Sequence, residues 1–472
     1  MNAQRTLTRN ESGSTLVVVM VLALALMIST LAVLEFGTQD ASLARRDVQT
    51  ARAFYLAEAG LERAVSWLEA QSTFPTSAVM PFGEEPTILG DGDYFAEVYI
   101  DSVNSTATRP AYVVRSTGTA GGKMRVLEVD VAPQSFADFL YFTDIEHEVG
   151  GGTPCWFISS DEIDGPLHTN DQISIFGDPV FRDDVTSAYG GPDDSNTNHN
   201  AMFLYYNGDV HNHIESPDPS NAPHDNPTFE SGYELGDTMI EMPNVLADLQ
   251  DLAEAGGVVL VTLTGGYDVV MSRPDDVTGE PMYGYVSYRL GNQPWTDLDL
   301  TDINGMIYIK GGANVSGTLD GRLTIASTSN MYITDDITYR GSDENGPLPD
   351  CDDILGLVSG SDIILENNTP NQSDLEIHAA MMALNTSIRA DGYNVGDPRG
   401  TLTIYGGLVQ QVRGAVGTGY LDENGEAVIL TGYAKDYHYD YRLRELPPPG
   451  FFQTGTYKEL AWRDVGTYVE EG

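Results

Sequence analysis

Leu16–Leu34 reads LVVVMVLALALMISTLAVL, an apolar run without a charged residue. The first proline of the chain is Pro75, so nothing interrupts the continuation of this run into the helical sequence ARAFYLAEAGLERAVSWLEA at residues 51–70. At a rise of about 1.5 Å per residue, the apolar run is roughly 28 Å long, which matches the hydrocarbon core of a bilayer. The sequence therefore predicts a membrane-spanning helix over residues 16–34.

The flanking charges predict how this helix is oriented. Arg5 and Arg9 precede the span, which favours a cytoplasmic N-terminus, although Arg45 and Arg46 on the other side weaken the signal. A cleavable secretory signal has a shorter apolar region followed closely by a cleavage site, whereas this run leads into more helix. We expect a single-pass protein whose large C-terminal part lies outside the membrane.

Beyond the span, apolar residues recur at spacings of three and four, which predicts one buried stripe on a continuous helix over residues 14–71. The stripe consists of Phe54, Ala57, Leu61, Ala64, Val65 and Leu68. Short segments rich in β-branched and aromatic residues follow at 93–98, 112–116 and 123–131. We expect them to form a small antiparallel sheet, within residues 72–135, that covers the stripe.

This N-terminal part resembles the type IV pilin superfamily, in particular the PilX-type minor pilins. The resemblance rests on a short basic leader ending in Gly13, the apolar stretch from Ser14, AFYLAEAGLERA at 53–64 and YVVRSTGTAGGKMRVLEV at 112–129. It implies a cytoplasmic leader at residues 1–13 that a prepilin peptidase removes after Gly13, so that Ser14 becomes the new N-terminus. A plain single-pass anchor that is never processed is the alternative.

The same resemblance implies partners and a location. Pilin-like subunits assemble with one another on an inner-membrane platform, so we expect a bacterial inner-membrane protein, anchored by residues 16–34, that can enter a pilus. Pilins typically carry Glu at the fifth mature position, but this chain has Val18 there. A carboxylate inside a bilayer is costly unless it is paired, so Val18 removes both that cost and a specific assembly contact. The departure suggests a minor or pseudopilin-like subunit.

Residues 136–446 predict a large all-β domain, which makes the expected fold class α+β. Short apolar triplets such as ISI, IYI, LTI and IIL recur between Gly, Asn and Asp residues, and strict two-residue alternation is poor. This pattern favours a β-solenoid, with a β-sandwich as the alternative. A polar insertion is expected near residues 190–228, and the tail 447–472 is expected to cap the open end of the solenoid.

The same region resembles DUF4900, a bacterial domain family of unknown function. The matching sequences are FADFLYFTD at 136–144, IDGPLHTNDQISIFGDPVF at 163–181, ILGLVSGSDIIL at 354–365, LEIHAAMMALNTSI at 375–388, GTLTIYGGLVQQVRG at 400–414 and the closing segment 432–457. The family implies no particular chemistry.

The charge balance excludes one class of partner. The chain has 70 acidic and 24 basic side chains, a formal net charge of −46. Such a surface repels nucleic acid, so we expect no nucleic-acid binding. An acidic surface of this kind is also typical of proteins exposed to high salt, where screening weakens self-repulsion; solubility alone is the alternative explanation.

Cys155 and Cys351 are the two cysteines, and an even number in an exported chain allows one disulfide between them. The bond requires Cα atoms within about 7 Å, which a sequence does not specify. Both the bridged and the reduced states therefore stay open.

Two clusters have the residue types of metal sites. Asp209, His211, His213 and Glu215 alternate along a possible strand, so their side chains would share one face. Asp343, Asn345, Asp350, Asp352 and Asp353 form a loop rich in the hard oxygen ligands that Ca²⁺ prefers, but without the EF-hand order. A polar insertion and a solvated acidic loop are the respective alternatives.

No catalytic constellation is evident in the sequence: it lacks a P-loop, a dinucleotide fingerprint, CxxC and the GxSxG elbow. We expect no enzyme and predict a minor pilin or pseudopilin-like component of a type IV pilus or of a type II secretion-like system. In this interpretation its large acidic head serves adhesion or assembly. The alternative is an envelope-anchored glycan-binding protein or polysaccharide-active enzyme.

Overall fold

The chain folds into two compact units. The computed structural model describes residues 12–71, 74–105, 109–147, 155–188, 203–205, 210–211, 227–235, 238–422 and 427–466. The small unit contains Met1–Ser105, Ala111–Ala132 and Glu459–Gly472, and the large unit contains Thr106–Pro110 and Pro133–Lys458. The large unit is therefore an insertion within the chain of the small one.

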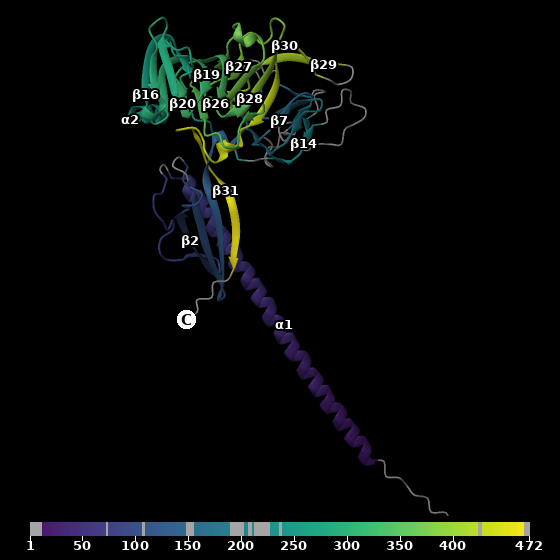
Figure 1. The fold of residues 1–472 in the computed structure, drawn as a ribbon. Coiled ribbons are helices and arrows are strands. Elements are labelled where there is room, and N and C mark those ends of the chain that lie inside the picture. Colours follow the sequence, from purple (N-terminus) through teal and green to yellow (C-terminus); the bar gives the residue numbers. More distant parts are fainter. Residues whose placement is uncertain are drawn as a thin grey trace, which may run out of the picture. The chain divides into compact units, whose positions relative to one another are not determined.

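The small unit begins with a single long helix, α1 (Ser12–Glu69), of 58 residues. In Figure 1 its N-terminal part extends well beyond the strands of the same unit. The hydroxyl of Thr30, inside the apolar run, donates to the carbonyl of Leu26 at 2.9 Å, so this polar group has an acceptor within its own helix. The continuous helix through the apolar run agrees with the prediction.

The strands of the small unit form a five-stranded sheet in the order β1-β2-β3-β4-β31. They are β1 (Thr87–Leu89), β2 (Gly92–Ile100), β3 (Tyr112–Ala120), β4 (Lys123–Ser135) and β31 (Gln453–Gly466). The pairs β1–β2, β2–β3 and β3–β4 are antiparallel, as the sequence predicted. The C-terminal tail, which we expected to cap a solenoid, instead supplies the fifth strand beside β4.

The helix packs on this sheet through small residues. Of the predicted stripe, Ala57, Leu61, Ala64 and Leu68 are buried and Phe54 and Val65 are half-buried. Ala53, which the prediction missed, is buried as well. Gly60 is also part of the contact: a Cβ atom there would lie 2.1 Å from the Ser116 hydroxyl. Such close approach of helix and sheet requires residues without bulky side chains.

The large unit is almost entirely β-structure. Its first part contains η1 (Phe136–Asp138), β5 (Tyr141–Ile145), β6 (Phe157–Ile158), β7 (Glu162–Asp164), β8 (Leu167–Thr169), β9 (Ile173–Phe176), β10 (Val180–Phe181), β11 (Val185–Ser187), β12 (Phe203–Tyr205), β13 (Val210–His211), β14 (Thr228–Phe229) and β15 (Tyr233–Leu235). Its middle part contains α2 (Ala247–Gly256), β16 (Val258–Met271), β17 (Tyr285–Leu290), β18 (Thr296–Asp299), η2 (Leu300–Asp302), β19 (Met306–Leu319), β20 (Arg322–Ser327), β21 (Met331–Tyr339), β22 (Ser342–Asp343) and β23 (Gly346–Pro347). Its last part contains β24 (Ile354–Ser359), β25 (Ile363–Leu365), η3 (Pro370–Gln372), β26 (Leu375–Ala383), β27 (Ile388–Ala390), β28 (Pro398–Val412), β29 (Gly417–Leu421), β30 (Ala427–Tyr439) and η4 (Tyr441–Arg444).

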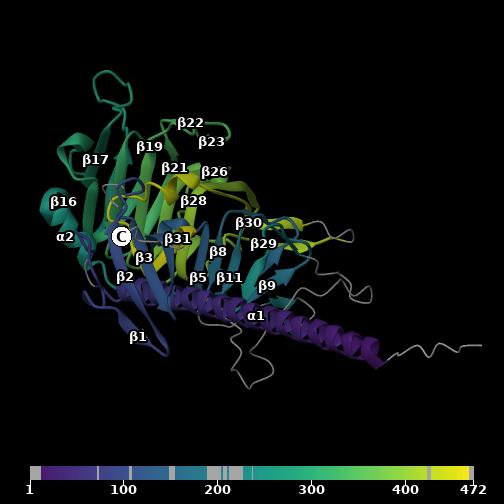
Figure 2. The same ribbon diagram turned by 90° about the horizontal axis from the view of Figure 1, so that it is seen from below.

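Most of these strands belong to one 20-stranded sheet, and the others form sheets of four strands (β13-β12-β9-β6) and two strands (β22-β23). Figure 2 shows β19, β21, β26 and β28 following one another across the large unit. The pairs that connect β19, β20, β24, β26 and β28 are parallel. Antiparallel hairpins are added at β16–β17–β18 and at β29–β30.

The predicted β-solenoid is wrong, whereas the α+β class is right. The turns of a solenoid stack in chain order, so that each contacts only its neighbours in the sequence. Here β28 pairs with β5 and β30 pairs with β7, so strands from the two ends of the large unit lie next to each other. The strands also range from two residues to the 15 of β28. The β-sandwich alternative fails too, because sandwiches are built from antiparallel sheets.

A column of apolar side chains in register forms the core of the large unit. Each residue of the column is paired with the next, across strands from β19 to β11. All of them are buried: Ile307, Ile325, Leu357, Met381, Leu408, Tyr141, Leu167 and Val185. Burial of apolar surface at about 25 cal/mol per Å² makes this column a main source of stability for the unit.

Candidate membrane stem and ligand cleft

The first candidate site is the membrane stem, which we define as residues 16–34 of α1. Its apolar side chains are exposed in the described part of the chain; Leu16 is 65% exposed and Leu34 70%. Among the described residues, α1 is the one helix long and apolar enough to cross a membrane. Soluble monomers rarely expose so extended an apolar surface, which instead marks a contact with lipid or with other proteins.

The residues predicted for processing lie at the start of the same helix. Gly13 and Ser14 belong to its first turn, and Val18 follows at an exposed position. An apolar side chain at Val18 continues the surface of the stem without any group that could pair with an amine. Cleavage after Gly13 stays a prediction.

The second candidate site is a pocket of about 650 Å³ in the large unit, which we call the Lys435 cleft. Four parts of the chain line it: residues 155–161 with Phe176, the pair Tyr393–Asn394, the segment 413–420, and side chains of β30. Its volume lies within the range of about 300 to 1,000 Å³ that is typical of small-molecule sites.

A buried arginine forms one wall of the cleft. Arg413 has a side chain that is 5% exposed and pairs with Glu146 at 2.8 Å. It also donates to the carbonyls of Cys155 at 2.7 Å and Trp156 at 3.2 Å, and lies 3.9 Å from the centre of the Phe157 ring. These contacts hold the segment before β6 against the segment after β28. The Arg413 guanidinium therefore has a structural role.

A second ion pair contributes the ammonium group after which the cleft is named. Lys435 Nζ lies 2.7 Å from Asp161 Oδ2; the lysine side chain is 21% exposed and the aspartate 2%. The backbone N–H of Ile158 donates to the same carboxylate at 3.0 Å. Asp161 is therefore fixed as an acceptor, while Lys435 retains N–H groups that can reach solvent.

Aromatic rings make up much of the remaining wall. Tyr420 is 50% exposed, and the Trp156 and Phe176 rings meet edge to face with centroids 6.4 Å apart. Tyr433 is buried, and its hydroxyl donates to the carbonyl of Asn371 at 2.6 Å. Burial raises the pKa of Tyr433, so this hydroxyl stays protonated. Sequence reasoning missed the cleft, since it combines residues 155–176 with residues 393–435, which are far apart in the chain, and neither region carries a recognisable motif.

The two cysteines are not bridged in the structure. Cys155 lies in the cleft wall, before β6. Cys351 lies between β23 and β24, where its thiol donates to Asp353 Oδ2 at 3.4 Å. Burial raises the pKa of the Cys351 thiol, which disfavours the reactive thiolate.

The predicted calcium loop is not assembled as a cation site. Both carboxylate oxygens of Asp353 accept backbone N–H groups, from Gly321 at 2.6 Å and Gly341 at 2.9 Å. Asp350 and Asp352 are exposed, and Asp343 accepts from the backbone N–H of Asn345 at 2.8 Å within a hairpin. Across the described residues, no group of three or more His, Cys, Asp or Glu side chains could hold a metal.

The predicted histidine site falls largely outside this description. Asp209, His213 and Glu215 lie outside the described residues, and His211 is described through the backbone of β13 alone. Its four predicted ligands therefore stay a prediction.

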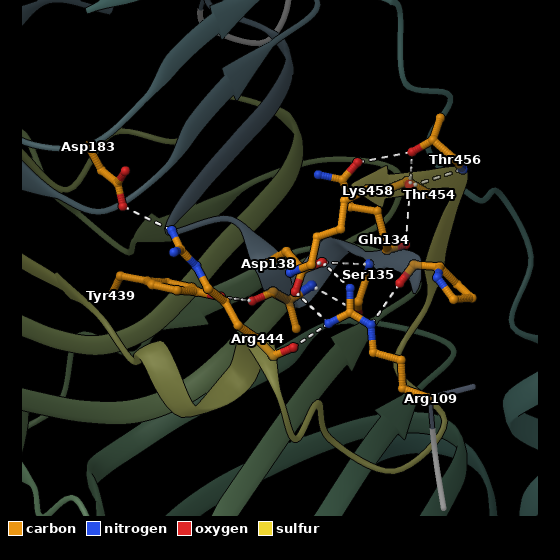
Figure 3. A network of polar contacts seen from close by, with 12 residues as sticks. Arg109, Gln134, Ser135, Asp138, Asp183, Tyr439, Arg444, Thr454, Thr456 and Lys458 are labelled. Atoms are coloured by element: carbon orange, nitrogen blue, oxygen red, sulfur yellow. Dashed lines mark hydrogen bonds and ion pairs between the residues drawn. The ribbon is translucent and has the colours of Figure 1, made fainter. Parts of the chain in front are cut away.

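A third feature is a buried polar network at the point where the chain enters and leaves the large unit. We call it the Asp138 network; Figure 3 shows Asp138 at its centre between Arg109 and Lys458. Arg109 Nη2 lies 2.9 Å from Asp138 Oδ2, and Lys458 Nζ lies 3.4 Å from the same oxygen. Burial lowers the pKa of Lys458, while Asp138 acts against this effect.

Comparison with known proteins gives limited matches. The domain of unknown function DUF4900 matches residues 94–189, which include two of the six sequences on which the predicted resemblance rests, at 136–144 and 163–181. The match begins at residue 94 rather than at 136 and does not reach the other four sequences. No curated protein matches. Among solved structures, the chain is similar to the competence-associated pilin ComZ from Thermus thermophilus, at 11% identity and a TM-score of 0.33, with 89% of this chain and 98% of that chain covered. A TM-score of this size does not establish a common fold.

Proposed function

We propose that this chain is a minor pilin-like subunit, held in the bacterial inner membrane by the membrane stem. Its short N-terminus lies in the cytoplasm and its large unit outside the membrane. The observation that carries the proposal is the change of environment along one uninterrupted helix. Residues 16–34 of α1 are exposed and apolar, whereas residues 53–68 present a buried stripe to the antiparallel sheet of the same unit.

The energetics of the stem support this reading. Burying apolar surface is worth about 25 cal/mol per Å², so an unpaired stem in water is strongly disfavoured. Lipid tails or the stems of neighbouring subunits provide the burial, and the helix satisfies its own backbone hydrogen bonds in either setting. The same surface therefore serves both as an anchor before assembly and as a helix–helix contact afterwards.

The proposal includes specific partners. A prepilin peptidase cleaves after Gly13, and an inner-membrane platform then assembles the mature chain with other pilin-like subunits. Val18, in place of a carboxylate, fits a subunit that does not need a paired charge at this depth. The large unit is displayed for adhesion or assembly, and we propose no catalytic role for it.

The test is N-terminal mass spectrometry of the full chain, produced in a host that has a prepilin peptidase. We expect a mature protein that begins at Ser14 and stays in the membrane fraction. The Gly13→Val variant should keep its leader, because the peptidase no longer finds its glycine, and should remain in the membrane fraction as well.

Two outcomes would contradict the proposal. An intact leader in the wild-type chain would indicate a plain anchor outside the pilin pathway. Cleavage beyond Leu34 with release of the protein from the membrane would show that residues 16–34 act as a secretory signal instead.

A further inference from the structure

We propose that the Lys435 cleft binds a neutral sugar ring of an uncharged oligosaccharide. This inference stands apart from the proposed pilin pathway, since it rests on the large unit alone. Three observations carry it: aromatic rings that line an open pocket, an ammonium group with unused donors, and the balance of charge in the walls.

The aromatic rings match the apolar faces of a sugar. A pyranose has C–H groups on its faces and hydroxyls around its edge, so it can pack one face on a flat ring while its edge makes hydrogen bonds. Tyr420 is half exposed at the cleft, and Trp156 and Phe176 line it as well. Aromatic side chains offer large rigid contact surfaces at low conformational cost.

The hydroxyls of the sugar have partners in the same walls. Lys435 Nζ carries three donors, of which one points to Asp161. The Tyr420 ring also carries a hydroxyl that can donate and accept. A few polar groups placed in a mainly apolar pocket are what orients a small ligand.

The charges of the cleft exclude ionic ligands. Arg413 is paired with Glu146, and Lys435 with Asp161, so the two cations and two carboxylates cancel. The chain as a whole has a net charge of −46, which repels phosphates, uronates and other anions. Among the described lining residues a cationic ligand would find no available carboxylate, because Asp161 is the one carboxylate there and is 2% exposed and already paired. A neutral polyhydroxylated ring is not repelled by the negative charge and does not need an available carboxylate.

The geometry fits binding without hydrolysis. Glycoside hydrolases need a pair of carboxyl groups, one on each side of the scissile bond. Among the described lining residues, Asp161 is the one carboxylate, and it is held by Lys435 and by the Ile158 backbone. A bound oligosaccharide would therefore be retained intact.

The test is isothermal titration calorimetry on the full chain in a detergent that has no sugar headgroup. The probes are the neutral hexasaccharides of maltose, cellulose and chitin type, and a hexamer of galacturonate serves as the charged probe of equal size. We expect saturable binding of at least one neutral hexasaccharide and weaker or no binding of the galacturonate hexamer.

Variants locate the binding. Tyr420→Ala should weaken binding of that hexasaccharide by about 3- to 10-fold, the loss expected for one aromatic contact. Tyr420→Phe, which keeps the ring and removes the hydroxyl alone, should weaken binding less than Tyr420→Ala does. Tyr283→Ala, which removes a comparably exposed tyrosine from another hollow of the large unit, should leave binding unchanged.

Three results would overturn the inference. The first is that none of the neutral hexasaccharides binds saturably. The second is that the galacturonate hexamer binds more tightly than all of them. The third is that Tyr283→Ala weakens binding as much as Tyr420→Ala does.

Discussion

Arg109 and Asp138 form a two-pronged ion pair inside the large unit, with side chains that are 5% and 4% exposed. The guanidinium donates to both carboxylate oxygens, at 3.2 and 2.9 Å, and also to the carbonyl of Pro133 at 2.9 Å. Asp138 further accepts the backbone N–H of Ser135 at 3.1 Å and contacts Lys458. One carboxylate thus ties together three chain segments that connect the large unit to the small one.

We predict that Asp138→Asn destabilises the large unit by about 3 to 5 kcal/mol. Asparagine has almost the same shape, so the loss reflects the Arg109 guanidinium, which would stay buried without its counter-charge. Lys458 would lose its nearest carboxylate as well. Urea unfolding followed by far-ultraviolet circular dichroism, which the β-rich large unit dominates, measures the change.

Glu162→Gln is the matched control, because it removes a carboxylate from an exposed pair of the same unit. Glu162 lies 2.6 Å from Arg182, and their side chains are 61% and 39% exposed. Exposed pairs contribute little to stability, so the urea midpoint should hardly move. Equal losses in the two variants would show that burial of the Asp138 network does not matter.

The helix–sheet contact of the small unit gives a second prediction. A Cβ atom on Gly60 would lie 2.1 Å from the Ser116 hydroxyl and 2.8 Å from the Tyr94 ring, so something must shift. Gly60→Ala should therefore destabilise the small unit by about 1 to 3 kcal/mol, even though alanine favours helices. Hydrogen exchange of the β2 and β3 amides in the full chain measures the loss.

Gly37→Ala supplies the control on the same helix. No atom lies within 4 Å of the Cβ position of Gly37, so the substitution meets open space. Helix propensity then decides the outcome, and the change should be neutral or stabilising by up to about 1 kcal/mol. Destabilisation at Gly37 as large as at Gly60 would contradict the packing explanation.

The helix could be predicted from the sequence because its signals are local. The apolar run and the spacing of Ala57, Leu61 and Leu68 specify a helix and its buried face without knowledge of any partner. The contact at Gly60 was not predicted, since a glycine inside a helix usually only lowers helix stability. Its role depends on Ser116 and Tyr94, which belong to strands much later in the chain.

Strand order and the cleft could not be predicted in the same way. The pairing of Leu408 with Tyr141 and the contact of Arg463 with Asp130 each join segments that are far apart in the sequence. Backbone hydrogen bonds of parallel strands are alike for every sequence, so apolar triplets indicate strands but not their neighbours. Residue types alone do not predict a metal site either. Asp353 was a predicted calcium ligand, but both of its carboxylate oxygens accept backbone N–H groups.

A buried histidine gives a prediction about pH. His378 is fully buried, and its Nδ1 accepts the backbone N–H of Tyr339 at 3.1 Å. Nε2 must then carry the proton and donate to Glu376 at 2.7 Å. Burial lowers the pKa of His378 below its usual value of 6.5, although Glu376 opposes the shift.

The sign of the effect follows from proton binding. With a lowered folded-state pKa, the unfolded chain binds more protons near pH 6, so this group's contribution to stability is complete above about pH 6.5 and is lost as the pH falls. We expect the free energy of unfolding to fall between pH 7.5 and 5.5 more steeply in the wild type than in His378→Gln. Above pH 7.5 the two curves should run parallel. Urea titrations at each pH provide the curves, and equal slopes below pH 6.5 would refute the assignment.

The excess of acidic side chains predicts a dependence on salt. With 70 acidic and 24 basic residues, most carboxylates lack a cationic partner and repel one another across the surface. Raising NaCl from 0.05 to 0.5 M shortens the screening length from above about 10 Å to about 4 Å, which should relieve this repulsion and raise the thermal midpoint. Choline chloride is the control: an equal gain identifies screening, whereas a gain with NaCl alone would point to sodium binding. A midpoint that falls with salt would mean that the ion pairs, such as Arg463 with Asp130, outweigh the repulsion.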